Sequence, residues 1–288
     1  MIEQKPEQTI WHSLQTLDRR WLYLILVILV IWQVIAPLKT ANVVSPPAED
    51  MYTYLSSLQP GDFIVVESDW TNSTRGESRG HFESLMRLLM RKKVRFVLTS
   101  IDPQAPQVAR DVLEMLVKEP GNNNYKEGQD YAIAGYYPNA EGHVNGMATR
   151  LVDELATKIG RNSAVLTGIN DLRDAKAVVL VTASSSINRW YERMRGKTKL
   201  GLFCTAVMAA ENYPYYVSGQ LFGLVVGAKG AYDMETLLAR EFTDPQFKNY
   251  GSGLRYMSPL AFALGLLILA VIAGNVAMFR VKKMGARQ

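Results

Sequence analysis

Two long stretches without charged residues dominate the hydrophobic pattern of this 288-residue chain. Residues 21–38 give 18 uncharged positions and residues 257–279 give 23. An α-helix needs about 20 apolar residues to cross the hydrocarbon core of a bilayer. The pattern therefore predicts one N-terminal and one C-terminal transmembrane helix and argues against a purely soluble protein. Because 20 residues precede the first stretch and no clear small-residue cleavage pattern follows it, we interpret it as a retained anchor and not a signal peptide.

Between these stretches, residues 39–256 show short apolar runs that alternate with segments of helical period. A short helix is expected over residues 48–58, and residues 119–130 have the composition of an exposed loop. Strands are predicted at 63–67, 94–99, 131–135, 177–182 and 200–204. Helices are predicted at 80–92, 105–118, 143–159, 187–195 and, through a glycine-rich stretch, 215–242. This alternation is typical of right-handed βαβ units, so we expect a mostly parallel, Rossmann-like three-layer α/β domain.

The positions of the basic residues set the expected orientation in the membrane. Arg19 and Arg20 precede the first apolar stretch, and residues 280–288 hold four basic and no acidic residues. Cytoplasmic flanks of membrane helices carry such an excess. We therefore expect tails at 1–20 and 280–288 in the cytoplasm and an extracytoplasmic domain at 39–256, in the bacterial cytoplasmic (inner) membrane. The net charge of +5 comes largely from the C-terminal tail and is no sign of a nucleic-acid-binding face.

Several familiar motifs are missing from the sequence. It contains no G-x-x-x-x-G-K-[ST], and the turn after the first predicted strand lacks G-x-G-x-x-G, so a standard nucleotide cradle is not expected. Three scattered histidines, and Cys204 as the single cysteine, do not match the ligand spacing of a metal site, and the lone cysteine excludes an internal disulfide framework. We therefore predict neither a cofactor nor a metal.

Polar residues follow the predicted strands, at the edge where open parallel sheets bind their ligands. The first strand ends in Glu67, Ser68 and Asp69. The candidates for a ligand site are Asp69, Asp102, Ser184, Ser185, Thr205 and Glu211. Each of them alone is better explained as a helix cap or turn residue. Only their shared position at one edge favours a site.

A serine hydrolase is an alternative. Membrane-anchored serine peptidases pair a serine that follows a strand with a lysine base, and this chain offers Ser184 to Ser186 and Lys229 in a similar order. The G-x-S-x-G elbow and the oxyanion glycines are missing. An enzyme is therefore the less favoured interpretation.

The region from Thr205 to Glu235 is unusual in joining tyrosines to a glycine-rich apolar run. With residues 17–20 and 274–276, it resembles an uncharacterised family of bacterial membrane proteins. The resemblance implies the same plan of one span, an α/β domain and a second span, and it implies no activity. Aromatic and small residues suit close protein contact, although a core helix entered through a proline turn explains the run somewhat better. The candidate interface residues are Tyr213, Tyr215, Tyr216, Gly223 and Gly227, with Gly265 and Gly274 in the second span.

These observations favour a non-enzymatic, membrane-anchored subunit whose outer α/β domain mediates assembly of a bacterial membrane complex, as a homo-oligomer or with other membrane subunits. Tails of 20 and 9 residues are too short to hold a cytoplasmic output domain. The alternatives are an extracytoplasmic ligand-binding domain that signals through a partner, and the serine hydrolase. Besides the lipid bilayer, no partner is identified, and nucleic acid is not expected.

Overall fold

We describe the protein from a computed structural model covering residues 10–15, 18–122, 124–185 and 187–285. The chain divides into two compact units. One comprises residues 41–254 and is called the α/β unit below. The other comprises residues 1–40 with 255–288 and is called the helical unit.

The α/β unit is built on a six-stranded sheet whose strand pairs are all parallel, in the order β3-β2-β1-β4-β5-β6. The strands are β1 (Phe63–Asp69), β2 (Arg95–Ser100), β3 (Tyr131–Tyr136), β4 (Ala177–Thr182), β5 (Lys199–Cys204) and β6 (Gly223–Val226). This order is that of doubly wound dinucleotide-binding sheets, in which the chain reverses direction across the sheet at the first strand.

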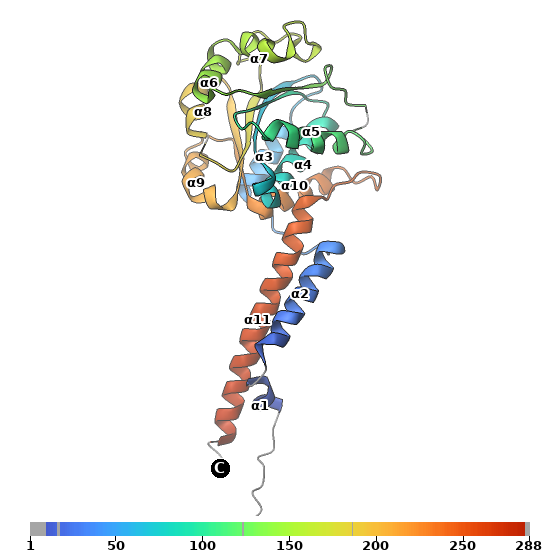
Figure 1. The fold of residues 1–288 in the computed structure, drawn as a ribbon, viewed down its shortest axis with the longest axis vertical. Helices are drawn as coiled ribbons and strands as arrows, with labels where there is room; N and C mark the ends of the chain where they lie inside the picture. The colour runs from blue at the N-terminus through green and yellow to red at the C-terminus, as the bar shows by residue number, and fades with distance from the viewer. Residues whose placement is uncertain (1–9, 16–17, 123, 186, 286–288) are drawn as a thin grey trace, which may run out of the picture. The chain divides into compact units, whose positions relative to one another are not determined.

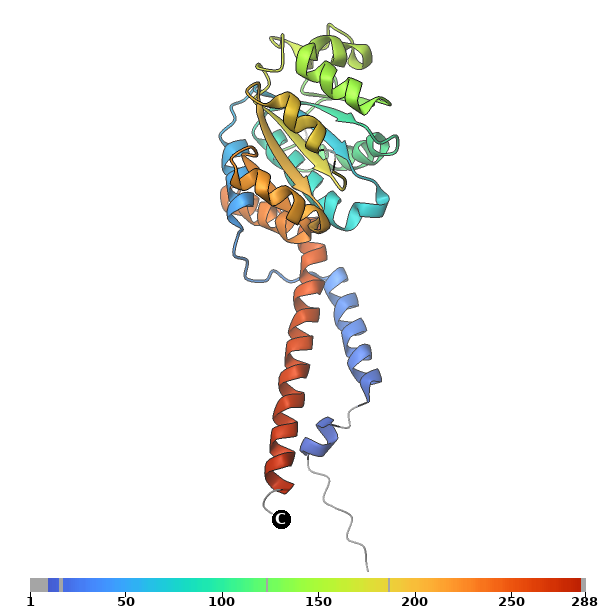
Figure 2. The same cartoon turned by 90° about the vertical axis from the view of Figure 1, so that its left-hand side faces the viewer.

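Helices cover both faces of the sheet (Figures 1 and 2). On one face lie α3 (Pro46–Ser56), α4 (Arg75–Arg91), α5 (Ala105–Leu116) and α10 (Gly227–Glu241), and on the other α6 (Ala140–Thr149), α7 (Leu151–Ile159) and α8 (Ile187–Met194), with α9 (Ala209–Val217) beside it. Alternate strand residues, such as Val65 and Val66, enter opposite cores. The fold is therefore a three-layer α/β arrangement. Short 3₁₀ turns, η1 (Asn72–Thr74), η2 (Ala164–Leu166) and η3 (Ala206–Met208), complete the connections.

The five predicted strands are confirmed with small changes at their ends, but the predicted helix over 215–242 is wrong. The chain there forms the end of α9, strand β6 and then α10. Gly227 has a φ of +60°, a left-handed conformation that glycine adopts without strain, and it separates β6 from α10. The predicted helix 143–159 is also two helices, which meet at Arg150.

The helical unit contains α1 (Ile10–Gln15), α2 (Arg19–Ile35) and most of α11 (Ser252–Gly285). Within the described residues, one helix, Ser252–Lys283, has the length and apolar composition needed to cross a membrane. Helix α2 has 17 residues and is therefore about 25 Å long. The hydrocarbon core of a bilayer is thicker, about 30 Å. It ends at Ile35, short of the predicted 38, because Pro37 disfavours helical backbone in the residue before it. The length of α2 therefore does not support the predicted N-terminal span.

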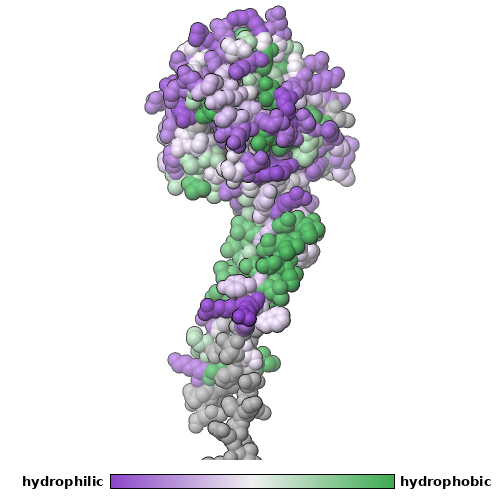
Figure 3. Space-filling model, in the orientation of Figure 1, coloured by the Kyte–Doolittle hydropathy of each residue, from purple (hydrophilic) through white to green (hydrophobic). Residues whose placement is uncertain are grey.

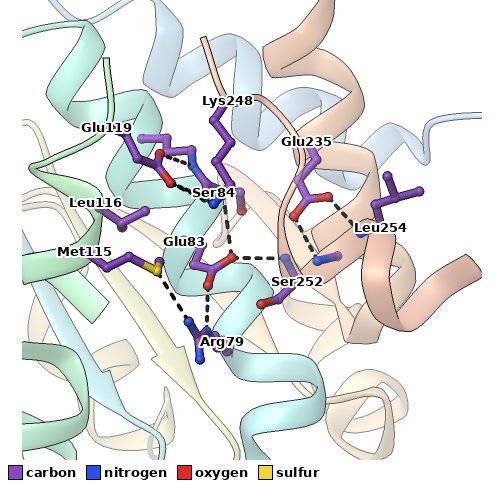
Figure 4. Close-up of polar contacts among 12 residues, drawn as sticks. Arg79, Glu83, Ser84, Met115, Leu116, Glu119, Glu235, Lys248, Ser252 and Leu254 are labelled. Carbon is purple, nitrogen blue, oxygen red and sulfur yellow. Dashed lines mark hydrogen bonds and ion pairs between the residues drawn. The ribbon is translucent and has the colours of Figure 1, made fainter. Parts of the chain in front are cut away.

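Two buried glutamates hold the first residues of α11 inside the α/β unit (Figure 4). Glu83 of α4 accepts a hydrogen bond from the Ser252 amide at 3.0 Å. Glu235 of α10 accepts from the Gly253 and Leu254 amides, both at 2.8 Å. The first amides of a helix have no partner within the helix and carry partial positive charge, which carboxylates satisfy. The start of α11 is therefore fixed to α4 and α10.

An arginine in α4 extends this network. Arg87 is fully buried and donates to both carboxylate oxygens of Glu119, at 2.8 and 2.9 Å. Glu83 lies 3.8 Å from the same guanidinium and accepts from Arg79 at 2.6 Å. The charge of each buried group is thus compensated, as burial of ions requires.

Helix α10 also holds the other end of the α/β unit. The fully buried Asp233 accepts hydrogen bonds from the Asn42 side chain at 2.9 Å and from the Ser45 amide and hydroxyl at 3.1 and 2.8 Å. Lys229 pairs with Asp233 and donates to the Val43 carbonyl at 2.9 Å. One helix therefore binds the first residues of this unit through Asp233 and its last residues through Glu235.

Candidate functional site

The carboxyl ends of β1 and β4 form the crevice position of this fold, because the chain winds away from that point in opposite directions across the sheet. Asp69 ends β1 and stands opposite Thr182, which ends β4. Both side chains are buried. The strand order therefore places one of the predicted site residues at the switch point.

Asp69 and Asp102 are brought together by a serine. The Ser100 hydroxyl donates to Asp69 Oδ1 at 2.8 Å, and the Ile101 amide donates to the same oxygen at 2.8 Å. The Asp102 amide donates to the Ser100 hydroxyl at 3.0 Å. The Asp102 carboxylate itself accepts from the amides of Gln104 and Ala105, where α5 begins. Asp102 is thus a helix-capping residue, whereas the buried Asp69 carboxylate also faces the carboxyl group of Glu67.

The remaining candidates do not join this pair. The Ser184 hydroxyl lies 3.1 Å from the Thr182 hydroxyl, and Ser184 and Ser185 are exposed. Thr205 is buried after β5, and Glu211 is exposed on α9. No hydrogen bond or ion pair within the described residues links Thr205 or Glu211 to Asp69.

A second buried residue from the end of the first strand lies beside Asp69. Glu67, in β1, is 1% exposed, and its carboxyl group contacts the Asp69 carboxylate and the Trp190 indole. Its Oε2 lies 4.0 Å from Nε2 of His143, which comes from α6. The other ring nitrogen of His143 lies 3.1 Å from Glu154 of α7. We call Glu67, Asp69, His143 and Glu154 the switch-point cluster.

Burial sets the protonation of this cluster. Burial, and next the neighbouring Asp69 carboxylate, raise the pKa of Glu67 well above its ordinary value. Burial also lowers the pKa of His143, although the Glu154 carboxylate opposes this. The favoured state is thus a protonated Glu67 and a neutral imidazole. If the nitrogen facing Glu154 carries the hydrogen, Nε2 is an acceptor that faces the protonated Glu67 carboxyl.

This arrangement can hold or exchange a proton, and it can bind a polar group. Aromatic rings enclose it: Tyr137 stacks on His143 with centroids 3.8 Å apart, and Trp190 meets the same ring edge-on at 6.2 Å. Residues of α6 and α7 cover the cluster, which is almost entirely shielded from solvent. The sequence positions of the three histidines did not predict that His143 would lie beside a carboxylate at the end of a strand.

A serine–lysine pair is not assembled. Lys229 pairs with Asp233 and the Val43 carbonyl, as described above, while Ser184 contacts Thr182. Within the described residues, no hydrogen bond connects Lys229 with Ser184 or Ser185. Ser186 lies outside the described residues. The geometry of these residues therefore lends the hydrolase no support.

The predicted interface tyrosines differ in their environments. Tyr213 is 51% exposed on α9. Tyr215 is half-buried, with its ring 4.2 Å from that of Tyr191, and its hydroxyl donates to Asn188 at 3.0 Å. Tyr216 is half-buried and donates to Asp50. Of the three, only Tyr213 presents most of its ring to solvent.

Two of the predicted interface glycines are buried within the α/β unit. A Cβ at Gly223 would lie 2.5 Å from the Met51 backbone, and one at Gly227 would lie 3.1 Å from Ala206. These two glycines therefore allow close packing within the α/β unit and do not face a partner. A Cβ at Gly265 or Gly274 on α11 would meet nothing within 4 Å, so the helix surface at these two positions is open.

Comparisons with protein families, curated proteins and solved structures found no match. Within the described residues, no group of three or more His, Cys, Asp or Glu side chains is arranged to hold a metal ion. The function must therefore be inferred from the molecule itself.

Proposed function

We propose that this chain is a two-pass protein of the bacterial cytoplasmic membrane, with both termini in the cytoplasm, whose extracytoplasmic α/β unit is a non-enzymatic assembly module. The apolar α11 supplies one span. Arg280, Lys282 and Lys283 at its end favour a cytoplasmic C-terminus. Arg287, which follows the same rule, lies outside the described residues.

The surface of the helical unit supports α2 as the second span. Large apolar side chains along α2 and α11 are exposed, among them Trp21, Ile28 and Leu269. Figure 3 shows a zone of apolar colour over part of these helices, which ends at a hydrophilic band. Gln33 is buried, and its side-chain oxygen accepts from the Ser258 hydroxyl at 2.7 Å and the Leu38 amide at 3.1 Å. An apolar exterior with a satisfied internal polar group suits a lipid environment.

The observation that carries the assembly role is an exposed apolar surface on η3 and α9. Val207, Tyr213 and Val217 are 86%, 51% and 68% exposed. Only two other large apolar side chains of the described α/β unit, Val43 and Tyr136, are exposed. Large apolar groups gathered on one short segment favour a protein contact. We call these three residues the α9 surface.

Mass determination tests this role. We would extract the full chain in mild detergent and measure the mass of the protein component and of any co-purifying chain. A defined oligomer or complex is expected for the native protein, and a smaller species for a variant with serine at all three positions of the α9 surface. A matched control places serine at Val43 and Tyr136, which are also apolar and exposed but lie elsewhere, and should leave the mass unchanged.

Two results contradict the assembly role of α9. One is a native protein that is monomeric and without partners in every mild detergent tried. The other is a triple variant that keeps the native mass while leucine at Gly265 and Gly274 dissociates the complex, which would place assembly in the second span and not in the α/β unit.

The switch-point cluster favours a second candidate function, the binding of a small polar ligand. Its support is that the carboxyl groups of Glu67 and Asp69 lie together almost fully buried, where polar groups cost free energy unless they are hydrogen-bonded, and burial favours a protonated Glu67 beside Asp69. Hydroxyl or amine groups have the complementary donors. Access requires movement of the covering α6 and α7.

Thermal unfolding tests the second candidate. A ligand that binds only the folded protein raises its Tm. We would screen small polyols and amines against the native chain and Glu67→Leu. A stabilising compound is expected for the native protein, with a smaller shift for the variant, whose side chain offers no hydrogen-bonding group. Stabilisation by no compound, or equal shifts in both proteins, would rule out Glu67 as a ligand-binding group.

A further inference from the structure

A cleft of about 770 Å³ lies at the opposite edge of the sheet from the switch-point cluster, where β5 and β6 begin. Its walls come from α3, the end of α8, and the loops that lead into the two strands. The volume is in the range of pockets that hold small organic molecules. Neither the predicted site residues nor the proposed assembly surface accounts for it.

Paired glycines shape this cleft. Gly201 of β5 stands opposite Gly223 of β6. A Cβ at Gly201 would lie 2.6 Å from the Phe222 ring, and one at Gly223 would lie 2.5 Å from the Met51 backbone. Helix α3 can therefore approach the sheet closely, and this brings Tyr54 of α3 against Phe222 with ring centroids 4.2 Å apart. The two rings form an aromatic wall.

Two cations line this cleft without acidic partners. Lys199 lies over the Tyr54 ring, with its ammonium 5.0 Å from the centroid, and Arg195 follows the end of α8. Both side chains are exposed. In the described part of the chain, neither has a hydrogen-bond or ion-pair partner. Such groups are available to pair with an anion.

The other polar groups of the cleft are also compatible with a bound anion. Among the described residues, Asp50 is its only carboxylate, and that carboxylate already accepts from the Tyr216 hydroxyl. The Tyr191 hydroxyl is buried and has no hydrogen-bond partner within the described residues. The cleft thus combines aromatic faces, two cations without ion-pair partners against one carboxylate, and an unused donor.

We propose that this cleft binds a small organic anion with an aromatic body, such as an aryl carboxylate, sulfonate or phosphate. The aromatic body stacks on Tyr54 and Phe222, and the anionic group pairs with Arg195 and Lys199. The site is separate from both proposed functions, so their failure leaves it standing.

The test uses the full chain in nanodiscs of zwitterionic lipid, with naphthalene-2-sulfonate as the probe and empty nanodiscs as the blank. Titration calorimetry should show saturable binding of one probe per chain, with Kd on the order of 100 µM. The matched cation, 2-naphthylmethylammonium, has the same ring system and should bind at least about tenfold more weakly. Added salt should weaken binding of the sulfonate, because exposed charges are screened.

Variants assign the binding to the cleft. Arg195→Gln with Lys199→Gln should weaken sulfonate binding about tenfold or more, because it removes both charge-assisted contacts. The control pair, Arg161→Gln with Arg173→Gln, removes the same charge from exposed side chains outside the cleft and should bind like the native protein. Tyr54→Phe should keep most of the affinity, and Tyr54→Leu should lose it.

Either of two results would overturn the proposal. One is the absence of saturable sulfonate binding above the empty nanodiscs at millimolar probe. The other is equal affinity of the native protein and the Arg195/Lys199 variant, with the near-ultraviolet circular dichroism of both unchanged. If that variant fails to fold, the comparison of Tyr54→Leu with Tyr54→Phe decides, and equal affinity of those two rejects the site.

Discussion

Replacing Glu235 with glutamine tests how the start of α11 is fixed to the α/β unit. In the folded protein Glu235 is completely buried, and it accepts from the Gly253 and Leu254 amides. Burial raises the pKa of this carboxyl from 4.5 to about 7, although the two amides and Arg87 oppose the rise. The carboxyl is therefore protonated in the folded state over a pH range where it is ionised in the unfolded chain.

The sign and size of the effect follow from linkage. Below pH 4.5 the group is protonated in both states and favours neither. As the pH rises to about 7, the unfolded chain releases its proton first, so the free energy of unfolding falls. The shift of the Glu235 pKa from 4.5 to about 7 lowers the free energy of unfolding by about 3 kcal/mol across this pH range. Above pH 7 both states are ionised, and the contribution becomes constant.

The glutamine variant lacks this titration. We expect the free energy of unfolding of Glu235→Gln, relative to the native protein, to rise by about 3 kcal/mol between pH 4.5 and 7.5 and then to level off. Urea unfolding of the full chain in detergent, at steps of half a pH unit, measures this difference. Tryptophan fluorescence is a suitable signal because Trp70 and Trp190 are buried in the α/β unit.

Glu83→Gln is the matched control. Glu83 also caps the start of α11, but its pKa is shifted in the opposite direction from that of Glu235. Burial raises the pKa of Glu83, but Arg87, Arg79 and the Ser252 amide outweigh it, so the net pKa is lowered. Its contribution to stability is present above the ordinary pKa and is lost as the pH falls. Glu83→Gln should thus be most destabilising at neutral pH. A native-minus-Glu235→Gln difference that stays flat from pH 4.5 to 8 would refute the reasoning.

Three further outcomes are expected. Gly253→Ala should destabilise the α/β unit by about 1–3 kcal/mol in urea unfolding, because its Cβ would lie 2.8 Å from backbone atoms of α10, whereas Gly265→Ala, with open space, should cost little. Arg87→Leu should cost up to about 3–5 kcal/mol, because the buried Glu119 would lose both hydrogen bonds from Arg87 and keep only the half-exposed Lys248 as an ion-pair partner, and stability equal to the native protein would contradict this. Cys204 is buried, and burial raises its pKa to about 12, so iodoacetamide should label it only after unfolding; rapid labelling of the native protein would show that it is accessible.

The strands were predictable because five of them are continuous apolar runs, as strands covered on both faces must be. Strand β6 was not, because it has only four residues and lies between glycines and a helical sequence. The same residues, LVV, fit a strand or a helix, and only pairing with β5 decides between them. Register with a neighbour is a long-range property that periodicity does not contain.

The candidate site was predictable only in its position. Strand order places Asp69 at the switch point, as expected for residues that end the first strand. The approach of His143 depends on how α6 returns over the sheet, and a single sequence does not specify this. One local signal was present: Glu67 continues an otherwise apolar strand, so its side chain had to be buried. Tyr191 and Lys199 gave no comparable signal, because their cleft is formed by segments that are far apart in the sequence.

Asp233 and Glu235 stand two residues apart on one helix, and this spacing has a mechanical consequence. The segment that enters the α/β unit and the helix that leaves it are bound to the same turn of α10. Both connections are therefore bound to one helix, and a displacement of α10 would disturb the two sets of hydrogen bonds together. Helix α10 starts directly at the end of β6, next to Ala206 and η3. The carboxyl end of the last strand is thus joined through a single helix to both ends of the α/β unit.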